Sequence, residues 1–157
     1  MPKPTPFLWF DSQAEEAAKF YTSIFPNSKI GTIARYGASG PGPAGSVMSV
    51  AFDLDGQSFT ALNAGPHFKF NEAISLSIDC QSQAEVDYFW DKLTADGGQP
   101  SQCGWLKDKF GVSWQVVPAR MIELLKDPDA GRASRAMQAM MTMTKIDVAK
   151  IEAAANG

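Results

Sequence analysis

The chain has 157 residues, of which 45% are hydrophobic and 11% aromatic, and this length and composition suit one compact domain over residues 1–157. Its formal net charge of −3 and its lack of a Lys/Arg run argue against nucleic acid as a partner, because nucleic-acid binding needs a basic surface. No stretch approaches the ~20 apolar residues that span a bilayer, so we expect a cytoplasmic protein with no membrane partner.

The first half of the chain, residues 6–64, is predicted to form a β-α-β-β-β module. Residues 7–11 are a strand candidate, and the helix after them ends before Pro26. Apolar residues at helical spacing are expected to be buried in this helix: Ala17, Phe20, Tyr21 and Ile24. Strand candidates follow at 29–36, 46–54 and 57–63. The last two flank Asp55-Gly56, a pair suited to a two-residue hairpin turn.

Residues 65–72 are predicted to be a connector, and residues 73–118 to repeat the module. Residues 73–79 alternate between polar and apolar in the manner of a strand. The helix that starts after Ser82 and ends before Gly97-Gly98 is expected to bury Val86, Phe89, Trp90 and Leu93. Strand candidates follow at 99–103, 105–107 and 112–117.

The tetrapeptide Ser-Gln-Ala-Glu stands at the start of both helices, at residues 12–15 and 82–85. Ser12 and Ser82 are each followed three residues later by glutamate, which is a capping box. In it the hydroxyl accepts from the third helical amide and the glutamate from the serine's own amide. The repeat predicts an internal duplication. Two such modules predict an α+β fold in which a mixed sheet curls around a concave cavity, with the helices outside.

Residues 119–157 are predicted to be a helical tail. A first segment, 120–126, stops before Pro128, and Asp129 or its neighbour can cap a second helix. Thr144 and Asp147 are weaker candidates for the cap of a third. The second helix has one face that we expect to pack on the sheet or on a partner subunit: Ala133, Ala136, Met137, Met140 and Met141. This face and the open sheet edges predict a homodimer.

Strand alternation also predicts which residues face the helices and which face the cavity. The helix side is expected to receive Leu8, Phe10, Ile74, Leu76 and Ile78. The cavity side is expected to receive Phe7, Trp9, Ala73, Ser75 and Ser77. In the final strand Trp114 and Val116 share one face, and Ser113, Gln115 and Val117 share the other. The cavity wall should therefore mix aromatic rings with small hydroxyls and an amide.

Several segments carry a family resemblance: Pro-Phe-Leu-Trp-Phe-Asp at 6–11, Ala-Glu-Glu-Ala at 14–17, Phe-Tyr at 20–21, and the runs 61–75, 102–108 and 110–118. With them the chain resembles the PhnB-like branch of the vicinal oxygen chelate (glyoxalase/bleomycin resistance) superfamily over nearly its whole length. This branch carries the label 3-demethylubiquinone-9 3-methyltransferase. The label implies S-adenosylmethionine, whose usual site is a glycine-rich turn between a strand and a helix. The sequence contains no such segment.

The resemblance also implies where a metal would bind, because metal enzymes of the superfamily take His and Glu ligands from four strand positions. These positions fall on Phe7 or a neighbour, Ala61 or Asn63, Ala73 and Gln115. None is His, Asp or Glu, and an amide oxygen is a weak ligand for a divalent ion. No metal or other cofactor is therefore predicted. The alternative is an unusual divalent-metal site formed by His67, Asn63 and Gln115. Cys80 and Cys103 are interpreted as free thiols.

The candidate contacts to a small ligand are Trp9, Asn63, His67, Phe68, Ser75, Trp105 and Gln115. The aromatic rings among them either stack on a flat ligand or fill a core. Asn63 and Gln115 are either ligand contacts or satisfied amides at strand ends. His67 either contacts the ligand or holds the connector in place through backbone groups. No residue is assigned a catalytic role.

Three functions remain open at this point. The leading hypothesis is a metal-free protein that binds a partly apolar small molecule. The first alternative is a metal-dependent isomerase, lyase or dioxygenase of the same superfamily. The second alternative is the methyltransferase activity that the family label implies.

Overall fold

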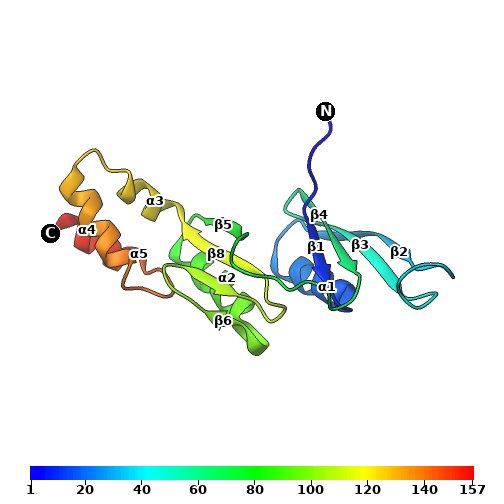
Figure 1. Ribbon diagram of the computed structural model, residues 1–157. Helices are drawn as coiled ribbons and strands as arrows, with labels where there is room; N and C mark the ends of the chain where they lie inside the picture. Colours follow the sequence, from blue (N-terminus) through cyan, green and yellow to red (C-terminus); the bar gives the residue numbers. More distant parts are fainter. The chain divides into compact units, whose positions relative to one another are not determined.

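The computed structural model describes residues 1–157, which form two compact units, Met1–Phe70 and Asn71–Gly157. The boundary between the units lies inside the predicted connector, residues 65–72. Each unit contains a four-stranded sheet with a helix on one face, and the helical tail belongs to the second unit (Figure 1). None of the helices combines the length and the apolar character that crossing a membrane requires.

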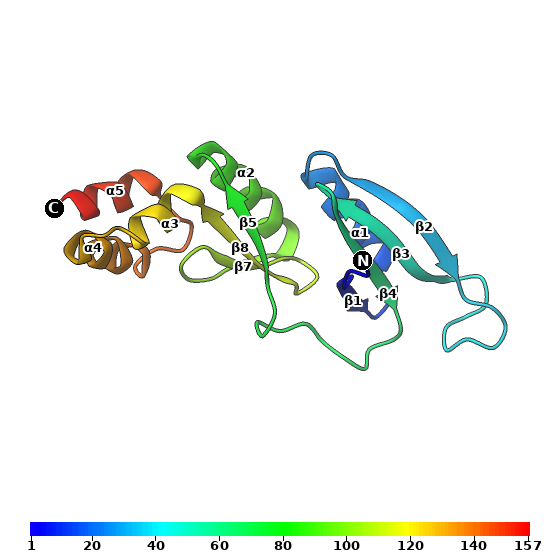
Figure 2. The same ribbon diagram turned by 90° about the horizontal axis from the view of Figure 1, so that it is seen from above.

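The first unit consists of β1 (Phe7–Phe10), α1 (Ala14–Ile24), β2 (Lys29–Arg35), β3 (Val47–Leu54) and β4 (Gln57–Asn63). The sheet order is β1-β4-β3-β2, with β1 parallel to β4 and the other pairs antiparallel. The helix α1 packs against β3 and β4 on one face of this sheet (Figure 2). Leu8 and Phe10 are buried, whereas Phe7 is 64% exposed, as alternation predicts. Asp55 and Gly56 both have positive φ angles, which confirms the predicted hairpin turn.

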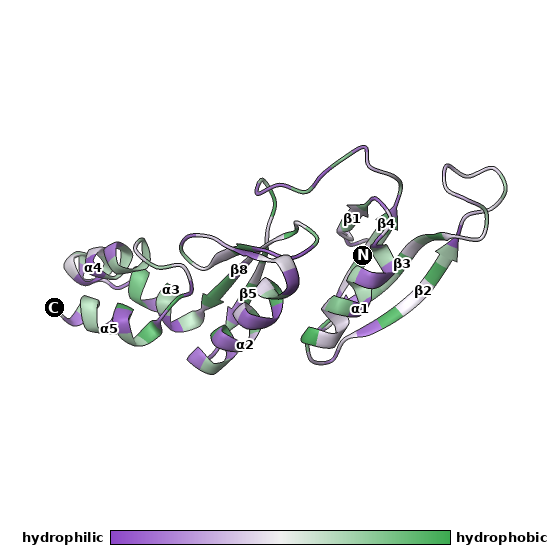
Figure 3. Ribbon diagram, turned by 90° about the horizontal axis from the view of Figure 1, so that it is seen from below, coloured by the Kyte–Doolittle hydropathy of each residue, from purple (hydrophilic) through white to green (hydrophobic).

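The second unit repeats this topology. It consists of β5 (Leu76–Cys80), α2 (Gln83–Thr94), a 3-10 turn (Ala95–Gly97), β6 (Gln99–Pro100), β7 (Trp105–Lys107) and β8 (Ser113–Pro118). Its sheet order is β5-β8-β7-β6, and β5 is parallel to β8. The predicted duplication and fold class are therefore confirmed. The helix α2 buries the four predicted residues, Val86, Phe89, Trp90 and Leu93. Strongly hydrophobic residues of β8, visible in Figure 3, lie in the same core.

The first strand of the second unit begins later than predicted. Ala73 lies in a turn and Ile74 in a bend, Ser75 is outside the strand, and Ile74 is 72% exposed instead of packing on the helix. One reason is that the neighbouring strand β8 begins at Ser113, which the register places opposite Ser75, so residues 73 and 74 have no partner on β8. A second reason is local, because the Asn71 side chain accepts a hydrogen bond from the Ala73 amide at 2.8 Å and turns the chain.

The two capping boxes differ from the prediction. Ser82 Oγ does accept from the Glu85 amide at 3.2 Å, but the Glu85 carboxylate accepts from the Gln81 amide, at 2.9 Å, and not from that of Ser82. The box predicted at Ser12 is wrong, because α1 begins at Ala14 and no side chain of the preceding turn caps it. The turn from β1 to α1 has three residues, whereas the turn from β5 to α2 has two. The extra residue moves Ser12 away from the cap position. Phe20, which was expected to be buried, is only partly so.

The tail forms three helices, α3 (Ala119–Leu125), α4 (Ala130–Met140) and α5 (Val148–Asn156). They share a core that consists of Met121, Leu124, Ala136, Ile146, Ile151 and Ala155. Asp129 and Asp147 cap α4 and α5, whereas Thr144 has no such role. The predicted face of α4 is narrower than expected, since Met137 and Met141 are 42% and 62% exposed.

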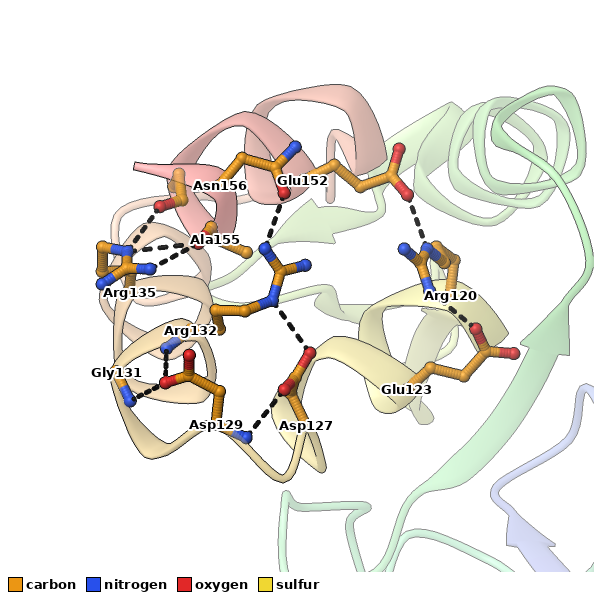
Figure 4. A network of polar contacts seen from close by, with 11 residues as sticks. Arg120, Glu123, Asp127, Asp129, Gly131, Arg132, Arg135, Glu152, Ala155 and Asn156 are labelled. Atoms are coloured by element: carbon orange, nitrogen blue, oxygen red, sulfur yellow. Dashed lines mark hydrogen bonds and ion pairs between the residues drawn. The ribbon is translucent and has the colours of Figure 1, made fainter.

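Three arginines connect the tail helices (Figure 4). Arg120 bonds Glu123 at 3.0 Å and Glu152 at 2.5 Å. Arg132 bonds Asp127 and Asn156, at 3.0 and 2.8 Å. Arg135 donates to the Ala155 carbonyl at 2.7 Å, near the end of α5, where a cation complements the helix dipole.

The segment before α5 attaches the tail to the second sheet and its helix. Backbone amides of Cys103 and Gly104 donate to the carbonyls of Met143 and Thr144, at 2.8 and 2.7 Å. The Gln83 side chain of α2 donates to the Ile146 carbonyl and accepts from the Val148 amide, both at 2.9 Å. Lys145 and Asp87 add an ion pair at 2.9 Å. The tail is therefore an integral part of the second unit.

Candidate functional site

The candidate site lies on the face of the second sheet that points away from α2. Strands β7 and β8 pair in antiparallel register, with Trp105 opposite Gln115 and Lys107 opposite Ser113. Residues directly opposite each other in a sheet share a face. Because Leu106, Trp114 and Val116 are buried on the α2 side, these four side chains point to the other face.

This face contains a cavity of about 250 Å³ at its β6–β7 edge. Most of the residues that line it are polar, namely Glu72, Gln99, Ser101, Lys107 and Ser113. The aromatic ring of Trp105 adds an apolar wall. Polar groups beside an aromatic side chain provide both hydrogen-bonding and apolar contacts for a small molecule.

The hydroxyl of Ser113 is the most unusual group in the cavity. The residue is 2% exposed, and its Oγ is the one buried side-chain nitrogen or oxygen atom in the chain that has no hydrogen-bond partner. Leaving a buried hydroxyl unpaired costs about 1–3 kcal/mol, so proteins rarely leave one without a function. The hydroxyl is therefore a buried donor and acceptor that no protein group uses, in a residue that lines the cavity.

Lys107 forms an ion pair with Glu72 at the wall of this cavity. Their side chains are 40% and 61% exposed, so the pair is open to solvent. A hydrogen bond from Lys107, together with its positive charge, lowers the pKa of the Glu72 carboxyl. One positively charged side chain, Lys107, therefore lines the cavity, and it is paired with the exposed carboxylate of Glu72.

Three of the residues predicted from the sequence meet on this face. Gln115 Nε2 donates to Ser75 Oγ at 3.0 Å, and Trp105 lies opposite Gln115 in the sheet. The amide of Gln115 thus already has a partner within the protein, while Trp105 lines the cavity.

Two further predicted residues meet in the first unit. Trp9 and Phe68 make an edge-to-face contact with ring centroids 4.8 Å apart, and Phe68 is 66% exposed. The Trp9 indole donates to the Gly65 carbonyl at 2.9 Å. His67 is exposed and makes no hydrogen bond or ion pair. The connector is therefore held by Trp9, and not by His67 as the sequence reading allowed.

Asn63 lies on the helix side of the first sheet. It pairs with Phe10, and its Oδ1 accepts from the Ala14 amide at 2.8 Å. Its Nδ2 donates to the Val47 carbonyl at 3.2 Å, and its own carbonyl accepts from the Tyr36 hydroxyl. Both ends of the amide are occupied by backbone groups, which agrees with the alternative reading of Asn63 as a satisfied amide at a strand end.

The residues present do not fit a metal ion at the positions that the superfamily uses. No group of three or more His, Cys, Asp or Glu side chains converges in the chain. Ala61 is fully buried on the helix side, Ala73 lies in a turn, and the Gln115 amide donates to Ser75. These groups supply no charged oxygen and no imidazole, which are the ligands that divalent ions prefer.

The structure does not fit the usual S-adenosylmethionine site either. Such a site places a glycine-rich turn between a strand and the helix that follows. The turns before α1 and α2 consist of residues 11–13 and 81–82 and contain no glycine, and β8 runs directly into α3.

Sequence reasoning did not select Lys107, Ser113 and Glu72 as site residues. Alternation had already placed Ser113 on the face of Gln115, and Lys107 follows Trp105 by two residues, so the pattern contained part of the signal. Neither the unpaired state of the Ser113 hydroxyl nor the contact of Glu72 with Lys107 is visible in the sequence, because both depend on folded distances.

A family model described as 3-demethylubiquinone-9 3-methyltransferase matches residues 2–117. Among solved structures, a Bacillus cereus PhnB protein with the same description is 39% identical, with a TM-score of 0.68 over 75% of this chain and 100% of the other. Protein PA1353 from Pseudomonas aeruginosa is 22% identical, with a TM-score of 0.62 over 75% and 98% of the two chains.

A more distant similarity is to the fosfomycin resistance protein FosX from Listeria monocytogenes, solved with Mn(II) and a sulfate ion. It is 14% identical with a TM-score of 0.55, over 80% of this chain and 95% of the other, so it indicates the fold alone. A comparison with curated proteins found no match. The family model ends at residue 117, directly before α3.

Proposed function

Because the chain belongs to the 3-demethylubiquinone-9 3-methyltransferase (PhnB) family, and has the fold of the glyoxalase/bleomycin resistance superfamily, we propose that it is a metal-free protein that binds a small molecule on the helix-free face of its second sheet. Binding, and not turnover, is the proposed role. The ligand would contact Trp105 and Ser113, next to the Ser75–Gln115 pair.

The buried, unpaired hydroxyl of Ser113 is the observation that supports this proposal most directly. A ligand with one polar atom in the cavity would satisfy the hydroxyl and remove the cost of leaving it unpaired. The Trp105 ring would cover the apolar part of the same molecule.

The test is a titration of isotope-labelled protein with small aromatic molecules, followed by amide chemical shifts. We expect the shifts to concentrate on β7 and β8. Ser113→Ala should weaken the binding without loss of stability, because the alanine removes an unpaired hydroxyl. Ser134→Ala, at an exposed position of α4, is the matched control. Shifts that avoid β7 and β8 for every molecule would refute the proposal.

The metal-dependent alternative makes an opposite prediction. Protein purified without a chelator should contain no stoichiometric Zn, Ni, Mn or Fe if the proposal is right. One metal ion per chain, measured by elemental analysis, would favour an isomerase, lyase or dioxygenase and contradict a metal-free site.

The methyltransferase alternative is tested by calorimetry with S-adenosylmethionine. We expect no saturable heat, since neither strand-to-helix turn provides a glycine-rich phosphate or ribose site. Saturable binding near one molecule per chain would restore the methyltransferase reading.

The proposal includes a cytoplasmic homodimer. Met137 on α4, Met141 directly after it, and Ile74 before β5 are exposed large apolar side chains that a second copy could cover. Light scattering at micromolar concentration should give twice the monomer mass. A monomer mass would contradict the dimer while leaving the binding site unaffected.

A further inference from the structure

We infer that the cavity of the second unit takes a small molecule with a carboxylate or a similar anionic group, and that Glu72 occupies the place of this anion until the ligand arrives. This inference rests on the proposed function, because it names the chemical class of the ligand for the same cavity.

Two residues with hydrogen-bond donors line this cavity from neighbouring strands. Lys107 and Ser113 are direct partners in the β7–β8 register, so their side chains leave the sheet from the same face. Lys107 is the only basic residue among those that line the cavity. An ammonium beside a hydroxyl is suited to a carboxylate, whose two oxygens can each accept one hydrogen bond.

Glu72 shows that a carboxylate can occupy this place. Its side chain forms an ion pair with Lys107 from the segment before β5, while the Ser113 hydroxyl remains without a partner. Glu72 therefore uses only one of the two donors. A ligand carboxylate that reaches both would gain a hydrogen bond that Glu72 does not make.

The ion pair is also easy to displace. Both side chains are substantially exposed, and ion pairs between exposed groups contribute little to stability. Glu72 lies in a turn outside any strand, so its side chain can leave without disturbing the sheet. The released Glu72 carboxylate would return to water at small cost.

The rest of the cavity favours a compact ligand with a flat apolar part. Trp105 provides an aromatic surface, and Pro100 adds apolar atoms. The amide of Gln99 and the hydroxyl of Ser101 lie on the same wall and can bond further polar groups. An aromatic monocarboxylate therefore matches both the charge and the surface of the cavity.

The experiment compares benzoate with its neutral analogue benzamide by calorimetry and by amide chemical shifts. We expect benzoate to bind at least tenfold more tightly, with shifts at Lys107 and Ser113. Glu72→Gln should increase benzoate affinity several-fold, because the internal competitor is lost. Lys107→Gln should abolish the preference for benzoate, and Ser113→Ala should reduce benzoate affinity several-fold.

Matched controls separate the site from the general charge of the protein. Lys109→Gln removes a cation two residues from Lys107 that does not line the cavity, and Glu16→Gln removes an exposed carboxylate of α1. Neither should change benzoate affinity by more than about twofold. Thermal unfolding of each variant verifies that it is folded.

The outcomes separate this inference from the proposed function. Benzamide binding as tightly as benzoate, with shifts on β7 and β8, would overturn the anion inference and leave the proposed function standing. An equal gain for Glu72→Gln and Glu16→Gln would likewise overturn it, since the effect would then be general. If neither molecule shifts the β7 and β8 amides, the anion inference and the proposed cavity both fail.

Discussion

The side-chain oxygen of Asn63, the last residue of β4, accepts a hydrogen bond from the amide of Ala14, the first residue of α1, at 2.8 Å. A residue far away in the sequence therefore satisfies the helix terminus for which Ser12 was the local candidate. The side-chain nitrogen of Asn63 donates to the Val47 carbonyl of β3, so this one side chain joins the helix to two strands.

Replacing this side chain should destabilise the first unit. We expect Asn63→Ala to lower the free energy of unfolding by about 1–2 kcal/mol, since it removes the cap and leaves backbone groups unpaired. Ser12→Ala, in the turn before the helix, should change it by less than about 0.5 kcal/mol. Urea denaturation measures both. An equal cost for the two substitutions would mean that Ser12 caps the helix after all.

Gln83 should control the attachment of the tail. We expect Gln83→Ala to cost about 1–2 kcal/mol, because it unpairs the Ile146 carbonyl and the Val148 amide. Hydrogen exchange should accelerate at the start of α5 more than in β8. The exposed Gln81, whose side chain makes no hydrogen bond, provides the control Gln81→Ala. Unchanged exchange in α5 would contradict this role.

Gly104 should tolerate no side chain. Its φ angle is 84°, and a Cβ atom there would lie 2.9 Å from the Val116 carbonyl oxygen and 3.1 Å from Ile146. Gly45 has the same φ angle with nothing within 4 Å, so Gly45→Ala measures the backbone cost alone. We expect Gly104→Ala to cost roughly 1–3 kcal/mol more than Gly45→Ala, from steric overlap. Similar denaturation midpoints for both variants would contradict the contact.

The two cysteines should differ in reactivity. Burial raises the pKa of the Cys80 thiol to about 12, and the nearby carboxylates of Glu85 and Asp79 act in the same direction. Because the thiolate is the nucleophile, Cys80 should resist a disulfide reagent at pH 8, whereas the partly exposed Cys103 should react. We expect one rapidly reacting thiol per chain in the native protein and two after unfolding. Cys103→Ser should remove the rapidly reacting thiol, and retention of it would contradict the assignment.

The Glu72 carboxyl should titrate below its usual pKa of 4.5, because Lys107 stabilises the charged form. Because the pKa of Glu72 is lower in the folded state, the ion pair contributes to stability at pH values above the usual pKa of the carboxyl. That contribution is lost as the pH falls through the lowered pKa. A carbon NMR titration should show this midpoint, and Lys107→Gln should move it back toward 4.5. Identical midpoints in the two proteins would show that the pair does not form in solution.

Local patterns in the sequence were sufficient for the repeated module. The apolar spacing of α2 predicted its four buried residues, Asp55-Gly56 predicted the hairpin, and alternation assigned the faces of β1 and β8. Each of these features is set by residues within a few positions of one another, because helix and strand periodicity and turn geometry are local properties of the backbone. The resemblance to a known superfamily was confirmed by the family model and the solved structures.

Only the tertiary structure decided the features that depend on distant partners. The start of β5 depends on where β8 begins, and the cap of α1 comes from Asn63. The state of the Ser113 hydroxyl and the pairing of Lys107 with Glu72 likewise depend on which groups the fold brings within hydrogen-bond reach. A hydrogen bond acts over about 3 Å, and residues far apart in sequence come that close only when the chain is folded. The sequence by itself therefore determined the modules, while the fold determined which polar groups are satisfied and which are left unpaired.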